Sequence, residues 1–223
     1  MESMGQTRKF FSLAVAAIFF IYTPASIAKE LDLGRLEKKY AQVGSLEADF
    51  TQEVYQATLA RTKTSRGAIM LSKPMLVRWE TLAPERSVLV SNGIKLWYFT
   101  PEAGAEDKKG QAIVSPASEL AKNPLIGILN GTIPIEQAFR IKSRSEKDGL
   151  HTLDLEPKKR MGDVSSAVLE VGSNYLIKQV KLIHHSGNTT KISLQKVRLG
   201  AKLPTNLFKF SPPPGTQVVE GSR

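Results

Sequence analysis

The chain has 223 residues, no cysteine and a formal net charge of +10, from 31 basic and 21 acidic residues. The absence of cysteine excludes disulfides, thiolate metal sites, iron–sulfur clusters, cysteine nucleophiles and a lipid anchor on an N-terminal cysteine. The length fits one domain, a hydrophobic fraction of 41% is sufficient for a packed core, and the basic charge suggests nucleic acid or an anionic membrane surface as partners.

The first 28 residues have the layout of a secretory signal peptide. Arg8 and Lys9 precede the apolar run Phe10–Tyr22, which is shorter than the roughly 20 residues of a membrane-spanning helix. Small residues follow, and they predict cleavage after Ala28; the alternative is an uncleaved membrane anchor. We therefore expect residues 29–223 to form a single exported domain.

Export weakens the case for nucleic acid. The basic residues are also scattered, with Arg61, Lys63 and Arg66 on one stretch and residues 158–160 on another. Neither stretch has aromatic residues between its charges, as a binder of single strands would require. We interpret these residues as solvated strand edges and turns, and we expect no nucleic-acid partner.

Helical spacing marks the start of this domain. Leu33, Leu36, Tyr40 and Val43 recur at intervals of three and four residues, so they share one face. This pattern predicts a helix over residues 30–44.

A period of two then predicts strands. In residues 46–54 the apolar side chains fall on even positions, whereas Glu47, Asp49 and Glu53 fall on odd ones. Asn92-Gly93 separates two apolar runs and is a strong hairpin signal. Further strands are predicted at residues 62–72, 75–79, 87–91, 94–100, 139–145, 150–156, 166–171, 175–184, 190–199 and 208–210.

Residues 101–138 interrupt the strands. Prolines there punctuate two short apolar pieces, Ala117–Ala121 and Leu125–Leu129, which we interpret as helices of one or two turns. Because such helices are not stable alone, we expect them to cover the sheet. The prediction is a mainly β fold with some α: about 10–11 strands in a curled antiparallel sheet, with helices on its concave side.

The chain carries no recognisable catalytic or metal motif. Of the three histidines, His184 and His185 are adjacent in a predicted strand and point to opposite faces, so they do not share a metal with His151. We therefore expect no enzyme activity and no metal site. The apolar residues form either an ordinary core or, under short helices that can move, the lining of a ligand cavity.

Four stretches carry a family resemblance. They are Leu46-Glu-Ala-Asp-Phe-Thr-Gln52, Gly67 through Lys73-Pro74 to Arg78-Trp79-Glu80, Val88-Leu-Val-Ser-Asn-Gly-Ile-Lys-Leu-Trp-Tyr-Phe-Thr-Pro101, and Phe208-Lys-Phe-Ser-Pro-Pro-Pro-Gly215. In this order and spacing the chain resembles the outer-membrane lipoprotein carrier proteins (LolA) of Gram-negative bacteria.

The resemblance implies an unclosed antiparallel β-barrel with a helical lid over an apolar cavity. It also implies a periplasmic chaperone that receives acylated lipoproteins from an inner-membrane lipoprotein-releasing ABC transporter, shields their acyl chains and delivers them to an outer-membrane lipoprotein receptor. No cofactor is implied in the carrier itself. We expect a monomer with transient contact to membrane surfaces.

The alternative function is a periplasmic lipid-binding sensor or regulatory module of the same fold that does not transport. Such sensors carry a second domain, for which residues 29–223 leave no room. The related receptor is itself a lipoprotein, and a chain without cysteine cannot be anchored in that way. Both considerations favour the carrier.

The candidate site has two parts. In relatives, a basic residue before the proline of a strand turn, usually arginine, helps to close the lid by hydrogen bonding to lid backbone. Lys73 occupies this place before Pro74, and the alternatives are a solvated turn lysine or a contribution from Arg78. The candidate lining of the lipid cavity is Tyr40, Leu46, Phe50, Val77, Trp79, Trp97 and Phe99.

Overall fold

The computed structural model describes residues 30–104 and 109–221. The expected signal peptide, residues 1–28, lies outside the described residues, so its cleavage stays a prediction. Among the described residues, no helix is both long and apolar enough to cross a membrane.

Twelve strands of the described chain form one sheet. The helices are α1 (Leu33–Gln42), α2 (Pro124–Leu129) and α3 (Ile135–Ala138), with single 3-10 segments at η1 (Ala57–Leu59), η2 (Ala117–Lys122) and η3 (Thr205–Phe208). The strands are β1 (Ser45–Gln56), β2 (Arg61–Ser72), β3 (Leu76–Ala83), β4 (Ser87–Asn92), β5 (Lys95–Pro101), β6 (Gly110–Pro116), β7 (Phe139–Lys147), β8 (Leu150–Pro157), β9 (Val164–Gly172), β10 (Ile177–His184), β11 (Thr189–Leu199) and β12 (Gln217–Glu220).

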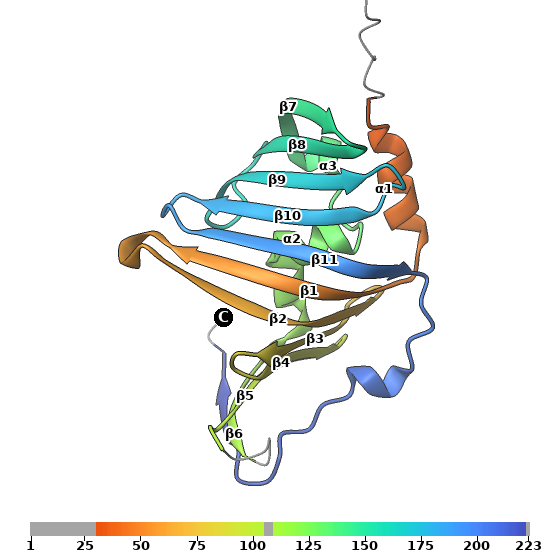
Figure 1. Ribbon diagram of the computed structural model, residues 1–223. Coiled ribbons are helices and arrows are strands. Elements are labelled where there is room, and N and C mark those ends of the chain that lie inside the picture. Colours follow the sequence, from red (N-terminus) through yellow and green to blue (C-terminus); the bar gives the residue numbers. More distant parts are fainter. Residues whose placement is uncertain (1–29, 105–108, 222–223) are drawn as a thin grey trace, which may run out of the picture.

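Strand β1 lies in the middle of the sheet, between β2 and β11. On one side β2 to β6 follow as consecutive antiparallel neighbours, and on the other side β11 to β7 do the same. The C-terminal strand β12 pairs in parallel with β6. The edges β12 and β7 are not paired with each other, so the sheet curls without closing (Figure 1), which confirms the predicted fold.

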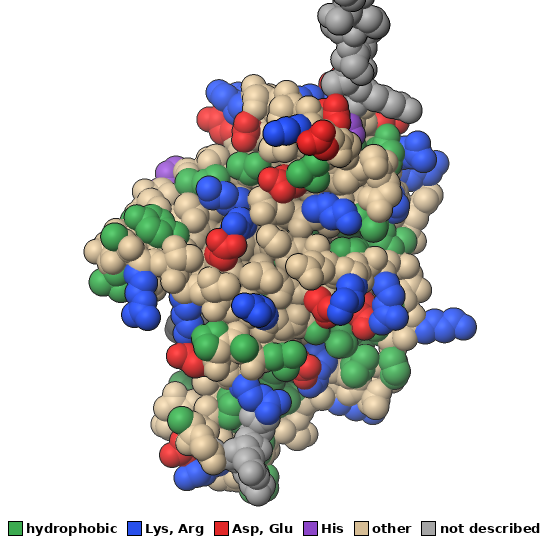
Figure 2. All heavy atoms as spheres, viewed as in Figure 1, with side chains coloured by type: hydrophobic (Ala, Val, Ile, Leu, Met, Phe, Trp, Pro, Cys, Tyr) green, Lys and Arg blue, Asp and Glu red, His purple; other side chains and the backbone are tan. Residues whose placement is uncertain are grey.

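The two faces of the sheet differ because side chains alternate along each strand. The inner face carries Leu46, Ala48 and Phe50 of β1, which are buried. The outer face carries charged residues joined in ion pairs, and acidic and basic side chains are mixed over it in Figure 2. The pairs on β1 and β11 are Glu47 with Arg198 (2.6 Å), Asp49 with Lys196 (2.8 Å) and Glu53 with Lys191 (2.7 Å).

In Figure 1, α2 and α3 lie behind the strands of the curled sheet, and α1 runs along the right-hand ends of the strands. Asp32 caps helix α1, because its carboxylate accepts a hydrogen bond from the Arg35 backbone N–H (2.9 Å). Of the predicted apolar stripe, Leu33, Leu36 and Tyr40 are buried, whereas Val43 lies just beyond the end of the helix and is partly exposed. In α2 every residue from Leu125 to Leu129 is buried. A short helix that is apolar on all sides is stable only inside a core, so α2 depends on the sheet and on α1.

Four elements were missed or misplaced by the sequence prediction. Strands β6 and β12 were not predicted, and helix α3 was not predicted either. The predicted strand at residues 208–210 is wrong, since Phe208 ends η3. Its apolar character has another cause: Phe208 is buried, and the Phe210 ring packs on the outer face against Trp97 and Phe99.

Candidate functional site

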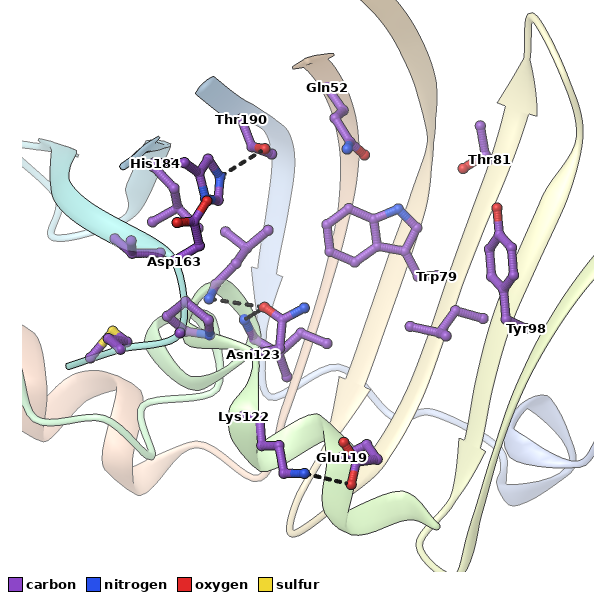
Figure 3. Close-up of a pocket in the computed structure, with 18 of the residues that line it drawn as sticks. Gln52, Trp79, Thr81, Tyr98, Glu119, Lys122, Asn123, Asp163, His184 and Thr190 are labelled. Carbon is purple, nitrogen blue, oxygen red and sulfur yellow. Dashed lines mark hydrogen bonds and ion pairs between the residues drawn. The ribbon is translucent and has the colours of Figure 1, made fainter. Parts of the chain in front are cut away.

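A cavity of about 610 Å³ lies between the inner face of the sheet and the segment formed by η2 and α2. Figure 3 shows Trp79 and Tyr98 on one side of this space, with Asp163, His184 and Thr190 on the opposite side. Its apolar lining consists of Trp79, Leu89, Tyr98, Pro124, Leu125, Ile126, Met161, Val164 and Leu182. A cavity of this size with a partly apolar wall fits an elongated apolar ligand with polar groups at its mouth.

Trp79 lies where the packed core meets the cavity. Its ring is 4.8 Å from the ring of Phe50, centroid to centroid, and Phe50 is buried whereas Trp79 is partly exposed. The alternation of β3 places Val77 on the same inner face, deeper in the core. One side of the indole is therefore held by the core, and the other is available to a ligand.

The segment η2–α2, which we call the cover, forms the wall opposite Trp79. Asn123 joins its two parts and caps α2, because its side-chain oxygen accepts from the backbone N–H groups of Leu125 (3.1 Å) and Ile126 (3.3 Å). The Asn130 amide at the end of α2 donates to the Pro74 carbonyl over 3.4 Å. The six-residue pieces of the cover have little helical stability of their own, and α2 is held in place by its buried residues Leu125–Leu129, so opening the cover exposes apolar side chains.

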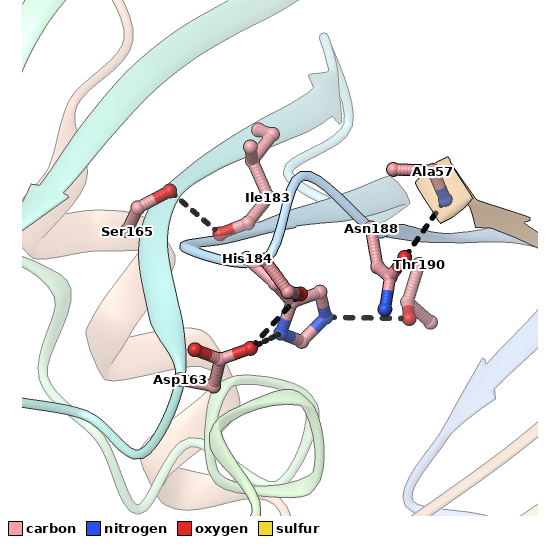
Figure 4. A network of polar contacts seen from close by, with 8 residues as sticks. Ala57, Asp163, Ser165, Ile183, His184, Asn188 and Thr190 are labelled. Atoms are coloured by element: carbon pink, nitrogen blue, oxygen red, sulfur yellow. Dashed lines mark hydrogen bonds and ion pairs between the residues drawn. The ribbon is translucent and has the colours of Figure 1, made fainter.

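Polar contacts fix the rim of the cavity at the ends of β9, β10 and β11 (Figure 4). The His184 ring lies with Nδ1 3.8 Å from the Asp163 carboxylate and Nε2 3.5 Å from the Thr190 hydroxyl. The Asp163 carbonyl also accepts from the His185 N–H (2.9 Å). Within the described residues no three His, Asp or Glu side chains are grouped as metal ligands would be.

Four of the expected lining residues belong to the core. Leu46, Phe50 and Val77 are buried on the inner face. Tyr40 is 2% exposed, and its hydroxyl oxygen accepts a hydrogen bond from the Ile177 N–H (2.8 Å). Burial raises the pKa of Tyr40 to about 12. These four side chains pack in the hydrophobic core and do not line the cavity. Of the expected residues, Trp79 lines it.

The expectation that Trp97 and Phe99 line this cavity is wrong. Trp79 pairs across the sheet with Leu89, and Leu89 pairs with Tyr98. Since Trp97 and Phe99 flank Tyr98 in β5, they point to the outer face. There the Phe210 ring lies 5.9 Å from Trp97 and 5.6 Å from Phe99, centroid to centroid.

Sequence reasoning missed Leu89 and Tyr98, because the hairpin signal fixes their pairing but not the face on which they lie. The Asn92-Gly93 turn sets the register of β4 against β5, and that register places Leu89 opposite Tyr98. Met161, Asp163 and His184 were also missed. No local pattern identifies them, because Met161 and Asp163 precede β9 and His184 ends β10, and only the folded sheet brings these positions next to the cavity.

Lys73 contacts the N-terminal helix, and its role in closing the lid stays a prediction. Its ammonium group donates to the backbone carbonyls of Tyr40 (2.8 Å) and Ala41 (2.7 Å) in the last turn of α1, and not to the cover. Burial lowers the pKa of Lys73. A cation at this end of a helix is also favoured by the helix dipole. Lys73 therefore ties the β2–β3 turn to α1.

Arg78 does not contribute to the cover. Its guanidinium group forms an ion pair with Glu80 and donates to the Leu207 carbonyl (3.1 Å). These contacts lie on the outer face, where they hold η3 against β3. The suggestion that Arg78 assists the lid is therefore corrected.

The fold has structural counterparts. The crystal structure of an uncharacterized conserved protein from Thermus thermophilus matches with a TM-score of 0.52 and 14% sequence identity, over 85% of this chain and 96% of that one. This similarity establishes the architecture alone.

The sequence comparison defines the family. Residues 41–211 match the family described as outer membrane lipoprotein carrier protein LolA, and the chain belongs to this family. Relatives named outer-membrane lipoprotein carrier protein include one from Dechloromonas aromatica (strain RCB), 32% identical over 78% of this chain and 81% of its own. Another, from Methylococcus capsulatus, is 29% identical over 88% of this chain and 91% of its own. The resemblance found in the sequence is confirmed.

Proposed function

We propose that this protein is a periplasmic carrier of acylated lipoproteins. It receives them from an inner-membrane ABC transporter, shields acyl chains in the cavity beneath the cover, and delivers them to an outer-membrane receptor. The observation that carries the proposal is the cavity lined by Trp79, Leu89 and Leu125 in a chain of the LolA family.

The physics of transfer agrees with this role. Each buried methylene contributes about 0.8 kcal/mol, so a long acyl chain does not cross an aqueous compartment unprotected. The carrier must nevertheless release its ligand, and a cover of short helices opens without disrupting the strands. Delivery then requires a receptor that offers the acyl chain a better apolar site. The carrier itself uses no cofactor, and the transporter consumes the ATP.

Export and charge fit the same proposal. Removal of residues 1–28 leaves a single carrier domain, which we propose to act as a monomer in the periplasm. The full chain has a formal net charge of +10 and residues 1–28 carry one net positive charge, so the remaining charge of +9 favours transient contact with anionic membrane surfaces or with acidic faces of its partners. Such contact weakens as salt increases.

The decisive experiment adds the purified protein to spheroplasts that are synthesising lipoproteins. A carrier releases the lipoproteins as a soluble one-to-one complex. A sensor or regulatory module of the same fold leaves them on the inner membrane, and that result would reject the carrier function.

A matched pair of variants connects release to the cavity. Leu89→Gln places an amide in the cavity, whereas Val88→Gln places it on the outer face of the same strand. We expect Leu89→Gln to reduce the amount of released lipoprotein and Val88→Gln to leave it near the wild-type level. Equal release by the two variants would show that this cavity does not hold the acyl chain.

A further inference from the structure

Four turns at one end of the sheet form a surface that we call the basic end. They connect β1 to β2, β3 to β4, β8 to β9 and β10 to β11, and they are residues 57–61, 84–86, 158–163 and 185–188. In Figure 1 the β1–β2 and β10–β11 hairpins mark this end at the left, where the β1–β2 hairpin extends furthest. Turns from distant parts of the sequence therefore meet at one end of the molecule.

Neighbouring turns of the basic end are joined by hydrogen bonds. The Ala57 N–H donates to the Asn188 side-chain oxygen over 2.9 Å (Figure 4). The His185 N–H donates to the Asp163 carbonyl, also over 2.9 Å. The turn at 84–86 lies on the other side of the β1–β2 hairpin, since β3 pairs with β2. The four turns therefore lie side by side along one edge.

Positive charge is concentrated at this edge. Its turns contain two acidic residues, Glu85 and Asp163, against five basic ones, which are Arg61, Arg86, Lys158, Lys159 and Arg160. The turns at the opposite end of the sheet, residues 73–75, 92–94, 148–149 and 173–176, contain one basic and one acidic residue, Lys73 and Asp148. The molecule is therefore electrically polar from one end of its strands to the other.

Most of these cations have no charged partner. Arg61, Lys159 and Arg160 are exposed, and none of them forms an ion pair with the described part of the chain. Lys158 donates to the Glu136 carbonyl (2.6 Å), which is a neutral group, so this bond does not cancel its charge. The charge of the basic end is therefore available to an anionic partner.

The basic end also presents an exposed apolar side chain at its furthest point. Leu59 lies in the β1–β2 turn, two residues before Arg61, and is 66% exposed. Figure 2 shows hydrophobic and basic side chains next to each other at the tip of this hairpin. Proteins that bind a lipid interface bury apolar side chains at a shallow depth while neighbouring cations stay at the level of the headgroups.

A lipid surface fits these features better than a protein surface does. A stable protein interface buries about 800 Å² on each partner and has a closely packed apolar centre. The basic end instead offers separate turns with scattered cations and a projecting leucine. A fluid bilayer yields to a projecting side chain, and its mobile anionic lipids are attracted to scattered cations.

We propose that the basic end docks on an anionic phospholipid surface, with Leu59 inserted and the cations at the level of the lipid phosphates. The inference rests on the proposed carrier function and adds the surface that meets the membrane. The cavity wall includes Met161, Gly162 and Asp163, which belong to the basic end. Docking therefore brings one wall of the cavity to the membrane surface.

Vesicle flotation tests the docking. The exported protein is purified and mixed with vesicles of phosphatidylcholine alone or of phosphatidylcholine and phosphatidylglycerol in equal parts. We expect wild type to bind the anionic vesicles in preference to the neutral ones and to be released by salt. Lys159→Gln/Arg160→Gln should bind the anionic vesicles about ten- to thirtyfold less, because each basic residue near such a surface contributes about a fivefold factor. Leu59→Ser should bind them about three- to tenfold less.

Two variants at the opposite end are matched controls. Lys147→Gln/Lys178→Gln removes the same net charge from two exposed lysines near the turns at 148–149 and 173–176. Ile94→Ser replaces an apolar side chain of the β4–β5 turn that is 77% exposed. We expect both controls to bind anionic vesicles like wild type, whereas an effect of net charge alone would weaken the lysine control as much as the basic-end variant.

Several results would overturn the docking. Equal binding of anionic vesicles by wild type and Lys159→Gln/Arg160→Gln is one, and equal losses in the basic-end variants and their controls are another. Reduced lipoprotein release from spheroplasts by Lys159→Gln/Arg160→Gln, with unchanged vesicle binding, would assign the basic end to an acidic protein partner. A wild type that releases lipoproteins without binding vesicles rejects the docking and leaves the carrier function standing. A wild type that binds vesicles at this end but releases no lipoprotein supports the docking and rejects the carrier function.

Discussion

Tyr40 links helix α1 to the sheet through a single buried hydrogen bond. Its hydroxyl accepts from the Ile177 N–H over 2.8 Å, and the residue is 2% exposed. Tyr40→Phe keeps the ring and leaves this N–H without a partner. An unpaired buried group costs about 1–3 kcal/mol, so near pH 7 we expect the free energy of unfolding to fall by about 2 kcal/mol.

The pH dependence of this difference gives a second, sharper test. Burial raises the pKa of Tyr40 to about 12, whereas an unfolded tyrosine titrates near pH 10. The folded state therefore retains the phenolic proton more strongly. The resulting contribution, about 2–3 kcal/mol, is fully present below pH 10 and is lost as the pH rises towards 12. Tyr40→Phe has no such group, so the stability difference from wild type should shrink to about zero across this window.

Urea unfolding at pH 7 and at intervals from pH 9 to 12 measures both effects. Other tyrosines and lysines titrate equally in the two proteins and cancel in the difference. Tyr55→Phe is the control at pH 7, because Tyr55 is 37% exposed and the loss of its hydroxyl should leave the free energy of unfolding unchanged. A constant stability difference between wild type and Tyr40→Phe from pH 9 to 12 would refute the reasoning.

Three other residues test the cavity, the α1 contact and the outer face. An acyl ligand should shift the fluorescence of Trp79 and not that of Trp97. We therefore expect the shift to persist in Trp97→Phe and to disappear in Trp79→Phe. A shift that persists in Trp79→Phe and disappears in Trp97→Phe would place the ligand on the outer face. Lys73→Leu removes both bonds to α1, so we expect a loss of about 1–2 kcal/mol in urea unfolding and altered rates of lipoprotein loading and release, largely restored in Lys73→Arg. Unchanged rates in Lys73→Leu would reject its role in closure. Phe210→Ala removes the ring that packs on Trp97 and Phe99 on the outer face, so we expect the free energy of unfolding to fall by about 2 kcal/mol and lipoprotein loading to stay unchanged. A stable Phe210→Ala variant with impaired loading would contradict the assignment of the ligand to the inner face.

The sequence predicts an element well where one face is wet and the other is buried. In β1, Leu46, Ala48 and Phe50 alternate with acidic residues, and the structure confirms that the first set is buried and the second lies outside. Asn92-Gly93 likewise predicts the β4–β5 hairpin, which the structure confirms. In both cases the signal is local and needs no knowledge of distant parts of the chain.

The site was harder to predict because β5 is apolar on both faces. Leu96 and Tyr98 face inward, while Trp97 and Phe99 are covered on the outer side by Phe210. Periodicity shows that these side chains alternate, but it does not show which set faces the cavity. That assignment depends on the C-terminal segment, more than a hundred residues away, and the same long-range dependence hides β12.

The central place of β1 has a consequence for biogenesis. Its partner on one edge is β2, the next strand in the chain, but on the other edge Leu46 pairs with Leu199 and Phe50 with Leu194. If the chain emerges from its N-terminus, the β1–β2 hairpin can form early, yet its second edge has no partner until nearly the whole chain has arrived. An open edge beside an apolar face is a template for aggregation, and contacts of such long sequence separation form slowly. A protein proposed to chaperone others therefore needs protection itself while it folds.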